Sequence, residues 1–100
     1  LYIPFPTQEL EERIIRARVP EISDGLRHQL VEFVQSLREL DLKKSPAVSE
    51  TIDWAKSLLL LHADKLEEEL IKNTLNVLLK YQDDINAAES EIRSLIPNAN

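Results

Sequence analysis

The sequence predicts an all-α fold, a small bundle of four to five helices behind a short extended segment. The 100 residues include one glycine, Gly25, whereas strands joined by tight hairpins need several glycines at positions of positive φ. Apolar residues recur every three or four positions, which is the period of an amphipathic helix. Leu, Ile, Glu, Lys, Arg and Ala dominate the composition, and most of these favour helices.

The first helix is expected after an extended lead-in over residues 1–6, where two prolines restrict strand pairing. Thr7 is the expected N-cap, and the break comes near Val19 because Pro20 disfavours helical geometry in the residue before it. The predicted apolar face consists of Leu10, Ile14 and Ala17. On the solvent side, the spacing favours two i,i+4 ion pairs, Glu9/Arg13 and Glu12/Arg16.

The second helix is expected to begin at Ser23 or Asp24 and to fade around residues 40–41. Its apolar stripe consists of Leu26, Leu30, Phe33, Val34 and Leu37. A break at residues 43–46 follows. Ser45 is predicted to cap a third helix with Pro46 at the first helical position, where its missing N–H costs nothing.

The third helix has a broad apolar face, which predicts burial on more than one side. The face comprises Val48, Ile52, Trp54, Ala55, Leu58, Leu59 and Leu61. Trp54 is expected to pack in the core or against another domain, and ligand stacking is the less favoured alternative. Leu58, Leu59 and, from the next helix, Leu75 and Leu78 are expected to pack with it.

Residues 62–65 are expected to form a connector before a fourth helix with acidic residues 67–69 in its first turn, as the helix dipole favours. The predicted inner face consists of Ile71, Thr74, Leu75 and Leu78, and the helix is expected to reach residues 80–81. From Asp83 a last segment carries Ile85, Ala88, Ile92 and Leu95 before Pro97. The pattern leaves open whether this segment is a fifth helix or a kinked extension.

Charge and composition exclude several classes of function. A net charge of −6 disfavours nucleic-acid binding, which requires clustered Lys and Arg. The absence of cysteine excludes disulfides and thiolate sites and favours a reducing, cytoplasmic compartment. The longest apolar run, residues 58–61, is too short to cross a membrane. The chain also lacks methionine, so we expect it to be part of a longer protein.

Catalytic and metal sites are not predicted. A P-loop needs two glycines and a Lys-Ser/Thr pair, so the chain is not expected to hydrolyse ATP by itself. His28 and His62 lie on different elements, and the acidic runs at 67–69 and 83–84 lack a calcium-loop glycine. We read these acidic runs as solvated helix starts. Lys43 and Lys44 lie near a helix start, an arrangement that can bind anions but more often forms a solvated loop.

Residues 37–56, LRELDLKKSPAVSETIDWAK, resemble the lid segment of MoxR-type AAA+ ATPases, in the branch linked with carbon monoxide dehydrogenase maturation. Residues 1–6 look like the end of that family's ATPase core, and residues 75–81 are similar to its late lid helix. The similarity extends from Leu1 to about Ile92. The resemblance implies that residues 1–100 are a C-terminal lid domain, with 1–6 as the linker from the core and 7–96 as the helical bundle.

The resemblance also implies a parent protein with an α/β ATPase core ahead of Leu1. Such proteins bind ATP and Mg²⁺ between core and lid, although the isolated lid would hold no cofactor. They form homo-oligomeric rings, usually hexamers, and remodel client proteins in a chaperone-like manner. They often work with a von Willebrand factor A-domain protein. The lid would rotate as a rigid body about residues 5–7.

The resemblance places the sensor 2 position, where the family has an arginine facing the γ-phosphate, at Ser49. Serine offers a hydrogen bond but no charge, so the lid would report nucleotide state through packing alone, or Lys43 or Lys44 would supply the charge. The residues expected nearest the nucleotide are Lys43, Lys44, Ser45, Pro46 and Ser49. The alternative is a free-standing helical interaction module whose acidic face binds a basic protein.

Overall fold

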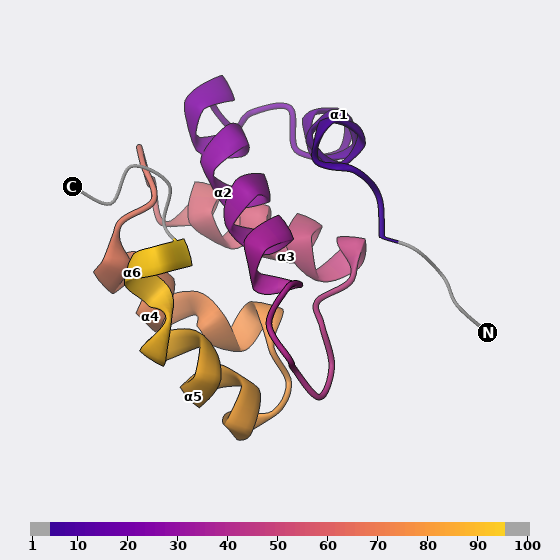
Figure 1. The fold of residues 1–100 in the computed structure, drawn as a ribbon. Helices are drawn as coiled ribbons and strands as arrows, with labels where there is room; N and C mark the ends of the chain where they lie inside the picture. The colour runs from indigo at the N-terminus through magenta and orange to yellow at the C-terminus, as the bar shows by residue number, and fades with distance from the viewer. Residues whose placement is uncertain (1–4, 96–100) are drawn as a thin grey trace.

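The computed structural model describes residues 5–95, in which six helices and no strand are present (Figure 1). The helices are α1 (Gln8–Arg18), α2 (Asp24–Leu37), α3 (Val48–Leu60), α4 (Glu68–Leu78), α5 (Gln82–Ser90) and α6 (Ile92–Leu95). The predicted all-α bundle is therefore confirmed. The prediction of an extended lead-in at residues 1–4 and the helix stop at Pro97 lie outside the described residues.

Helix α1 begins as predicted but buries a different face. The Thr7 hydroxyl accepts a hydrogen bond from the Leu10 amide at 3.2 Å, which confirms the N-cap. However, Leu10 and Ala17 are exposed and Ile14 is half-buried, so the predicted apolar face is wrong. The buried positions are Glu11, Ile15 and Val19, which recur at the helical spacing of four.

Neither predicted ion pair on α1 forms. Glu12 instead contacts His28 of α2, with 2.8 Å between Glu12 Oε2 and His28 Nδ1. The same carboxylate oxygen accepts a hydrogen bond from Gln8 at 3.2 Å. The carboxylate of Glu12 therefore faces His28 of α2 and Gln8 of its own helix, and not Arg16.

Helix α2 begins at the predicted cap, where the Ser23 hydroxyl accepts from the Leu26 amide at 3.2 Å, and its entire predicted stripe is buried. It ends at Leu37, three to four residues earlier than predicted. The Leu40 amide then bonds to the Leu37 carbonyl in a tighter turn. This early end releases residues 39–47 as a loop that runs toward α5 (Figure 1).

Helix α3 starts at Val48, so the prediction that Ser45 caps it with Pro46 at the first position is wrong. Ala47 is the N-cap, and its amide donates to the Glu50 side chain at 2.9 Å. Pro46 lies buried in the preceding segment, where its carbonyl accepts a hydrogen bond from Arg38 Nε at 2.8 Å. This tertiary contact places Pro46 before the helix, and the local capping signal could not reveal it.

The core lies between α2, α3 and α4. Trp54 is fully buried, its ring centroid lies 5.4 Å from that of Phe33, and its indole N–H donates to Thr74 at 2.8 Å. Leu58, Leu75 and Leu78 are buried too, and Leu59 packs against this core from a half-buried position. Core packing of the predicted residues is thus confirmed.

The C-terminal end of α3 leaves two leucines exposed. Leu60 is 80% exposed and Leu61 57% exposed, so the prediction that Leu61 widens the buried face is wrong. The helix ends at Leu60, and His62 turns the chain away with a positive φ of 58°. Residues 62–65 are non-helical, as predicted for the connector.

Helix α4 begins after Glu67 and ends at Leu78, two to three residues before the predicted end. Leu79 is extended and buried, and the chain starts α5 after Tyr81. The last segment is therefore a separate helix, and a break at Glu91 divides it from the short α6. No helix within residues 5–95 is long and apolar enough to cross a bilayer.

Candidate functional site

The loop at Lys43 and Lys44, for which anion binding was the less favoured interpretation, already binds a carboxylate of the same chain. The backbone amides of Lys43 and Lys44 donate to the two oxygens of Asp84, at 2.8 and 3.1 Å. Asp84 lies in the first turn of α5 and is only 2% exposed. It is therefore not part of a solvated helix start, as the sequence suggested. Its carboxylate connects the loop to α5.

The Lys43 side chain is also committed to α5. Its Nζ lies 2.8 Å from Asp83 Oδ2 and 5.9 Å from the centroid of the Tyr81 ring. The hydrogen bond and the attraction between opposite charges lower the pKa of Asp83 below its usual value and raise the pKa of Lys43. Lys44, in contrast, has no ion-pair partner within residues 5–95. Of the two lysines, Lys44 has the less committed charge.

Ser49 is exposed on the first turn of α3. Its hydroxyl lies 3.4 Å from Glu50 Oε1, the same oxygen that accepts the Ala47 amide. Of the other two residues predicted near nucleotide, Ser45 is half-buried and Pro46 is buried. The five predicted residues thus divide: Lys43 and Lys44 contact α5, Pro46 is buried, Ser45 is half-buried and Ser49 is exposed.

A buried ion pair that the sequence analysis missed lies beside this segment. Arg38 and Glu11 form a bidentate pair, with both guanidinium–carboxylate distances at 2.8 Å. Their side chains are 6% and 0% exposed. Gln35 donates to the same Glu11 carboxylate at 2.7 Å, and Arg38 Nε donates to the Pro46 carbonyl. Burial of such a pair requires this degree of hydrogen bonding, because both charges lose their hydration.

One signal in the sequence could have revealed Glu11. Ile15 and Val19 follow it at intervals of four, so all three residues share one helical face. The predicted apolar face was instead the neighbouring one, because its residues, Leu10, Ile14 and Ala17, are all apolar. Arg38 carries no comparable signal, since the sequence alone does not show that the second helix stops before it.

Residues 5 and 6, where the chain enters the helical bundle, contact the side chains that surround the buried ion pair. Gln35 donates to the Pro6 carbonyl at 3.1 Å, and the Arg38 guanidinium carbon lies 4.5 Å from the centroid of the Phe5 ring. Thr7 then caps α1. A rotation of the bundle about residues 5–7 would therefore have to break these contacts.

The described residues, 5–95, contain no cluster of three His, Asp or Glu side chains arranged to hold a metal ion. Comparison with protein-family models, with curated proteins and with solved structures finds no match for this chain. The MoxR resemblance therefore stays a prediction, carried by the residues quoted for it.

Proposed function

We propose that this chain is the C-terminal lid of a MoxR-type AAA+ ATPase, closing over ATP and Mg²⁺ bound by a preceding core. The observation that carries the proposal is the exposure of Ser49. The resemblance places this residue at the position of the family's γ-phosphate-facing arginine, and it lies on the first turn of a helix with its side chain accessible. A residue at that position can reach a nucleotide held by another domain only if it is exposed.

The chemistry of the α3 start is compatible with this role. The first amides of a helix have no acceptor within the helix and carry partial positive charge, so they attract phosphate oxygens. Ser49 adds a hydroxyl donor. Glu50 now accepts from both Ala47 and Ser49, so a γ-phosphate would compete with the Glu50 carboxylate for these donors. Lys44, rather than Lys43, would supply the positive charge that Ser49 lacks.

Two further features support a lid. The exposed Leu60 and Leu61 suit a surface that packs against another domain or subunit. The contacts that hold residues 5 and 6 to Gln35 and Arg38 would keep this entry segment together with the bundle when the lid turns. Rotation would follow from contacts that differ between the ATP and ADP states.

The proposal extends to the parent protein as a whole. It would assemble as a homo-oligomeric ring in the cytoplasm and use lid movement to pass nucleotide state between subunits. The work done would be chaperone-like remodelling of a client, together with a von Willebrand factor A-domain partner. The chain itself contributes no bond-making residue in this scheme.

Calorimetric titration with ATP·Mg²⁺ tests the proposal. We expect no binding to the chain alone, and binding to the protein that also carries the residues encoded before Leu1. In the longer protein, Ser49→Glu should weaken binding, because a carboxylate would face the γ-phosphate. Ser90→Glu is the matched control, since Ser90 is an exposed residue of α5. Equal affinity in the two variants would contradict the placement of Ser49.

A free-standing helical interaction module is the second candidate. It is favoured by the Asp84 carboxylate, which already occupies the amides of Lys43 and Lys44, so the loop presents no vacant anion site. Failure of the longer protein to bind ATP would favour this candidate. A search for basic protein partners would then be the next experiment.

A further inference from the structure

The Arg38 guanidinium joins the segment where the chain enters the bundle to the segment where α3 begins. Its central carbon lies 4.5 Å from the centroid of the Phe5 ring. Its Nε donates to the Pro46 carbonyl at 2.8 Å, and its Nη2 donates to the Thr51 hydroxyl at 3.4 Å. The bidentate bonds to Glu11 fix the plane of the group while it makes these contacts. One side chain thus contacts both segments.

The first turn of α3 depends on the groups that Arg38 contacts. The buried Thr51 hydroxyl donates to the Ala47 carbonyl at 3.3 Å, and the Thr51 amide donates to the same carbonyl at 3.2 Å. Pro46, the other contact of Arg38, immediately precedes Ala47, the N-cap residue. Arg38 therefore holds the beginning and the end of the turn that carries Ser49.

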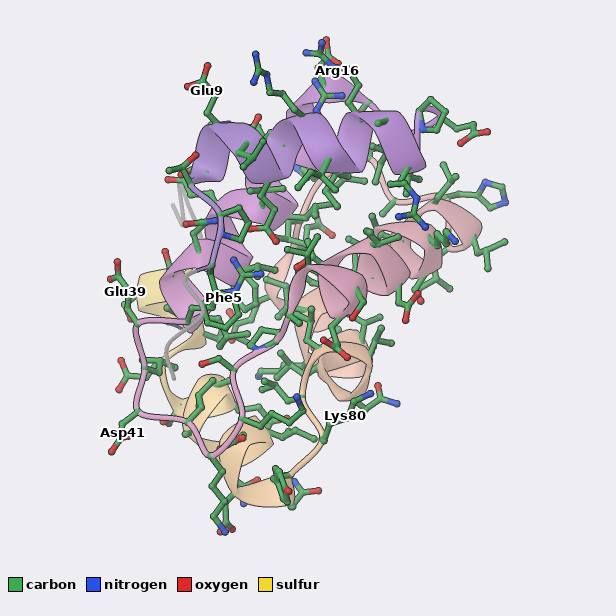
Figure 2. All side chains as sticks on the ribbon, turned by 90° about the vertical axis from the view of Figure 1, so that its right-hand side faces the viewer. Phe5, Glu9, Arg16, Glu39, Asp41 and Lys80 are labelled. Carbon is green, nitrogen blue, oxygen red and sulfur yellow. The ribbon has the colours of Figure 1, made fainter. Side chains whose placement is uncertain are left out.

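The entry segment, Phe5 and Pro6, lies at the exposed edge of these contacts. Phe5 is 47% exposed, whereas the side chains of Arg38 and Glu11 are 6% and 0% exposed. A hydrogen bond from Gln35 to the Pro6 carbonyl, 3.1 Å long, also ties the segment to α2. Figure 2 shows Phe5 below the first turn of α1 and above the loop that leads to α3. The Phe5 ring therefore covers part of the guanidinium from solvent.

Removal of this cover would weaken the bonds of Arg38 to the α3 segment. A hydrogen bond from a charged donor is stronger where water is excluded, because the local dielectric is low and no water competes for the donor. With the entry segment in place, the guanidinium keeps its donors for its three partners. Without it, water competes first for the contacts with Pro46 and Thr51, because these are single bonds to neutral oxygens. The bond to Glu11 is bidentate and joins opposite charges, so it is the last to weaken.

We propose that the entry segment controls, through Arg38, how firmly the first turn of α3 is held. Contact of Phe5 with the guanidinium tightens the turn, and a pull on the entry segment loosens it. The coupling itself follows from contacts within the chain. Its functional meaning rests on the lid assignment: if this turn faces a nucleotide, the segment that leads to the preceding domain regulates the nucleotide-facing turn of the lid.

Amide hydrogen exchange followed by NMR on the full chain tests the coupling, with the amide of Thr51 as the reporter. Phe5→Ala should speed its exchange about threefold, from the loss of a half-exposed cation–π contact. Leu10→Ala is the matched control, because Leu10 is an apolar residue of nearly equal exposure, 45%, on α1. The amide of Ile85 donates to the Tyr81 carbonyl in the first turn of α5, as the Thr51 amide donates in α3. It should keep its exchange rate in both variants.

A second variant tests whether Arg38 carries the coupling. Arg38→Lys keeps a cation beside Glu11, but one ammonium group cannot replace the planar set of donors that reaches Pro46 and Thr51. In this background Phe5→Ala should no longer change the exchange of the Thr51 amide. Circular dichroism checks that the variant folds. If it does not, Thr51→Val removes one contact of Arg38 with the turn and should reduce the effect of Phe5→Ala on the amide of residue 51.

Three outcomes would overturn the proposal. The first is the same exchange rate of the Thr51 amide in Phe5→Ala and Leu10→Ala. The second is a change of equal size at Thr51 and Ile85, which would show a general loss of stability. The third is an effect of Phe5→Ala that persists in full with Arg38→Lys or Thr51→Val. The test uses no nucleotide, so the coupling can fail while the calorimetric test of the lid succeeds, and the reverse.

Discussion

Two ion pairs in this molecule have the same contact distance and opposite surroundings. Arg38 and Glu11 meet at 2.8 Å with side chains that are 6% and 0% exposed. Lys43 and Asp83 also meet at 2.8 Å, but their side chains are 60% and 72% exposed. The first pair is bidentate and has three further hydrogen-bond partners, Gln35, Pro46 and Thr51. Burial and the number of partners, rather than distance, should decide what each pair contributes.

The two pairs also differ in what they connect. The buried pair joins α1 to α2, to the segment before α3 and to the chain entry at Phe5. The exposed pair joins the loop to α5 beside a stronger link, the Asp84 carboxylate that binds two backbone amides. We therefore expect Asp84, and not Asp83, to hold the loop.

The largest effect is expected from Glu11→Ala. This change leaves the Arg38 guanidinium buried without its counter-ion and should lower the free energy of unfolding by about 3 to 5 kcal/mol. Urea unfolding followed by Trp54 fluorescence measures it. Glu9→Ala, an exposed residue of the same helix, is the control and should change little. A loss in Glu11→Ala as small as in the control would contradict the account of the buried pair.

Asp84→Ala should have the next largest effect. Two backbone amides lose their acceptor, which should cost about 2 to 3 kcal/mol of unfolding free energy. Asp84→Asn keeps one acceptor oxygen and should lose less than Asp84→Ala. In the same urea titration, Asp83→Ala should shift the midpoint much less than Asp84→Ala, because an exposed ion pair contributes little to stability. If Asp83→Ala were the more damaging of the two alanine variants, the assignment of the loop contact to Asp84 would be wrong.

The hydrogen bond between Trp54 and Thr74 is buried like the first ion pair, but it joins two neutral groups. Thr74→Val is nearly isosteric but removes the acceptor of the Trp54 indole N–H, so we expect a loss of about 1 to 2 kcal/mol. Thr74→Ser keeps the hydroxyl and should recover part of this loss. Stability of Thr74→Val equal to that of the unmodified chain would show that the hydrogen bond contributes nothing.

The smallest expected effect concerns the exposed pair of Lys43 and Asp83. It is a change in the pKa of Asp83 rather than in the free energy of unfolding. Carboxyl NMR titration should place the pKa of Asp83 below the usual value of an aspartate carboxyl, and Lys43→Gln should return it toward that value. Because the pKa is lower in the folded state, the pair stabilises the fold above the unfolded-state pKa and loses this effect as pH falls through the lowered value. Lys44→Gln is the control and should leave the pKa of Asp83 in place. An unchanged pKa in Lys43→Gln would contradict the contact.

The sequence predicted the helices and most of the core because periodicity and capping are local properties. Thr7 and Ser23 cap their helices, and Trp54 lies in the core. Helix ends were predicted less well, because contacts distant in sequence determine them. Arg38 bonds to Pro46 and Asp84 binds the loop amides, and neither partner can be identified from spacing.

The candidate site likewise combines a feature that local periodicity indicates with features that depend on contacts distant in sequence. The exposure of Ser49 follows from its place on the outer side of the first turn of α3, which helical periodicity can indicate. The engagement of Lys43 with Asp83 cannot be predicted, because the two residues are 40 positions apart and meet only after α5 folds back onto the loop.

Hydrogen–deuterium exchange of the full-length protein with and without ATP·Mg²⁺ tests the proposed lid most directly. ATP should slow exchange of the amides in residues 47–50, the N-cap and first turn of α3, because phosphate oxygens would become their acceptors. Exchange in α5 should not change, since its contacts with the loop are internal to the bundle. Slowed exchange elsewhere in the protein with no change at residues 47–50 would contradict the claim that this turn faces the nucleotide.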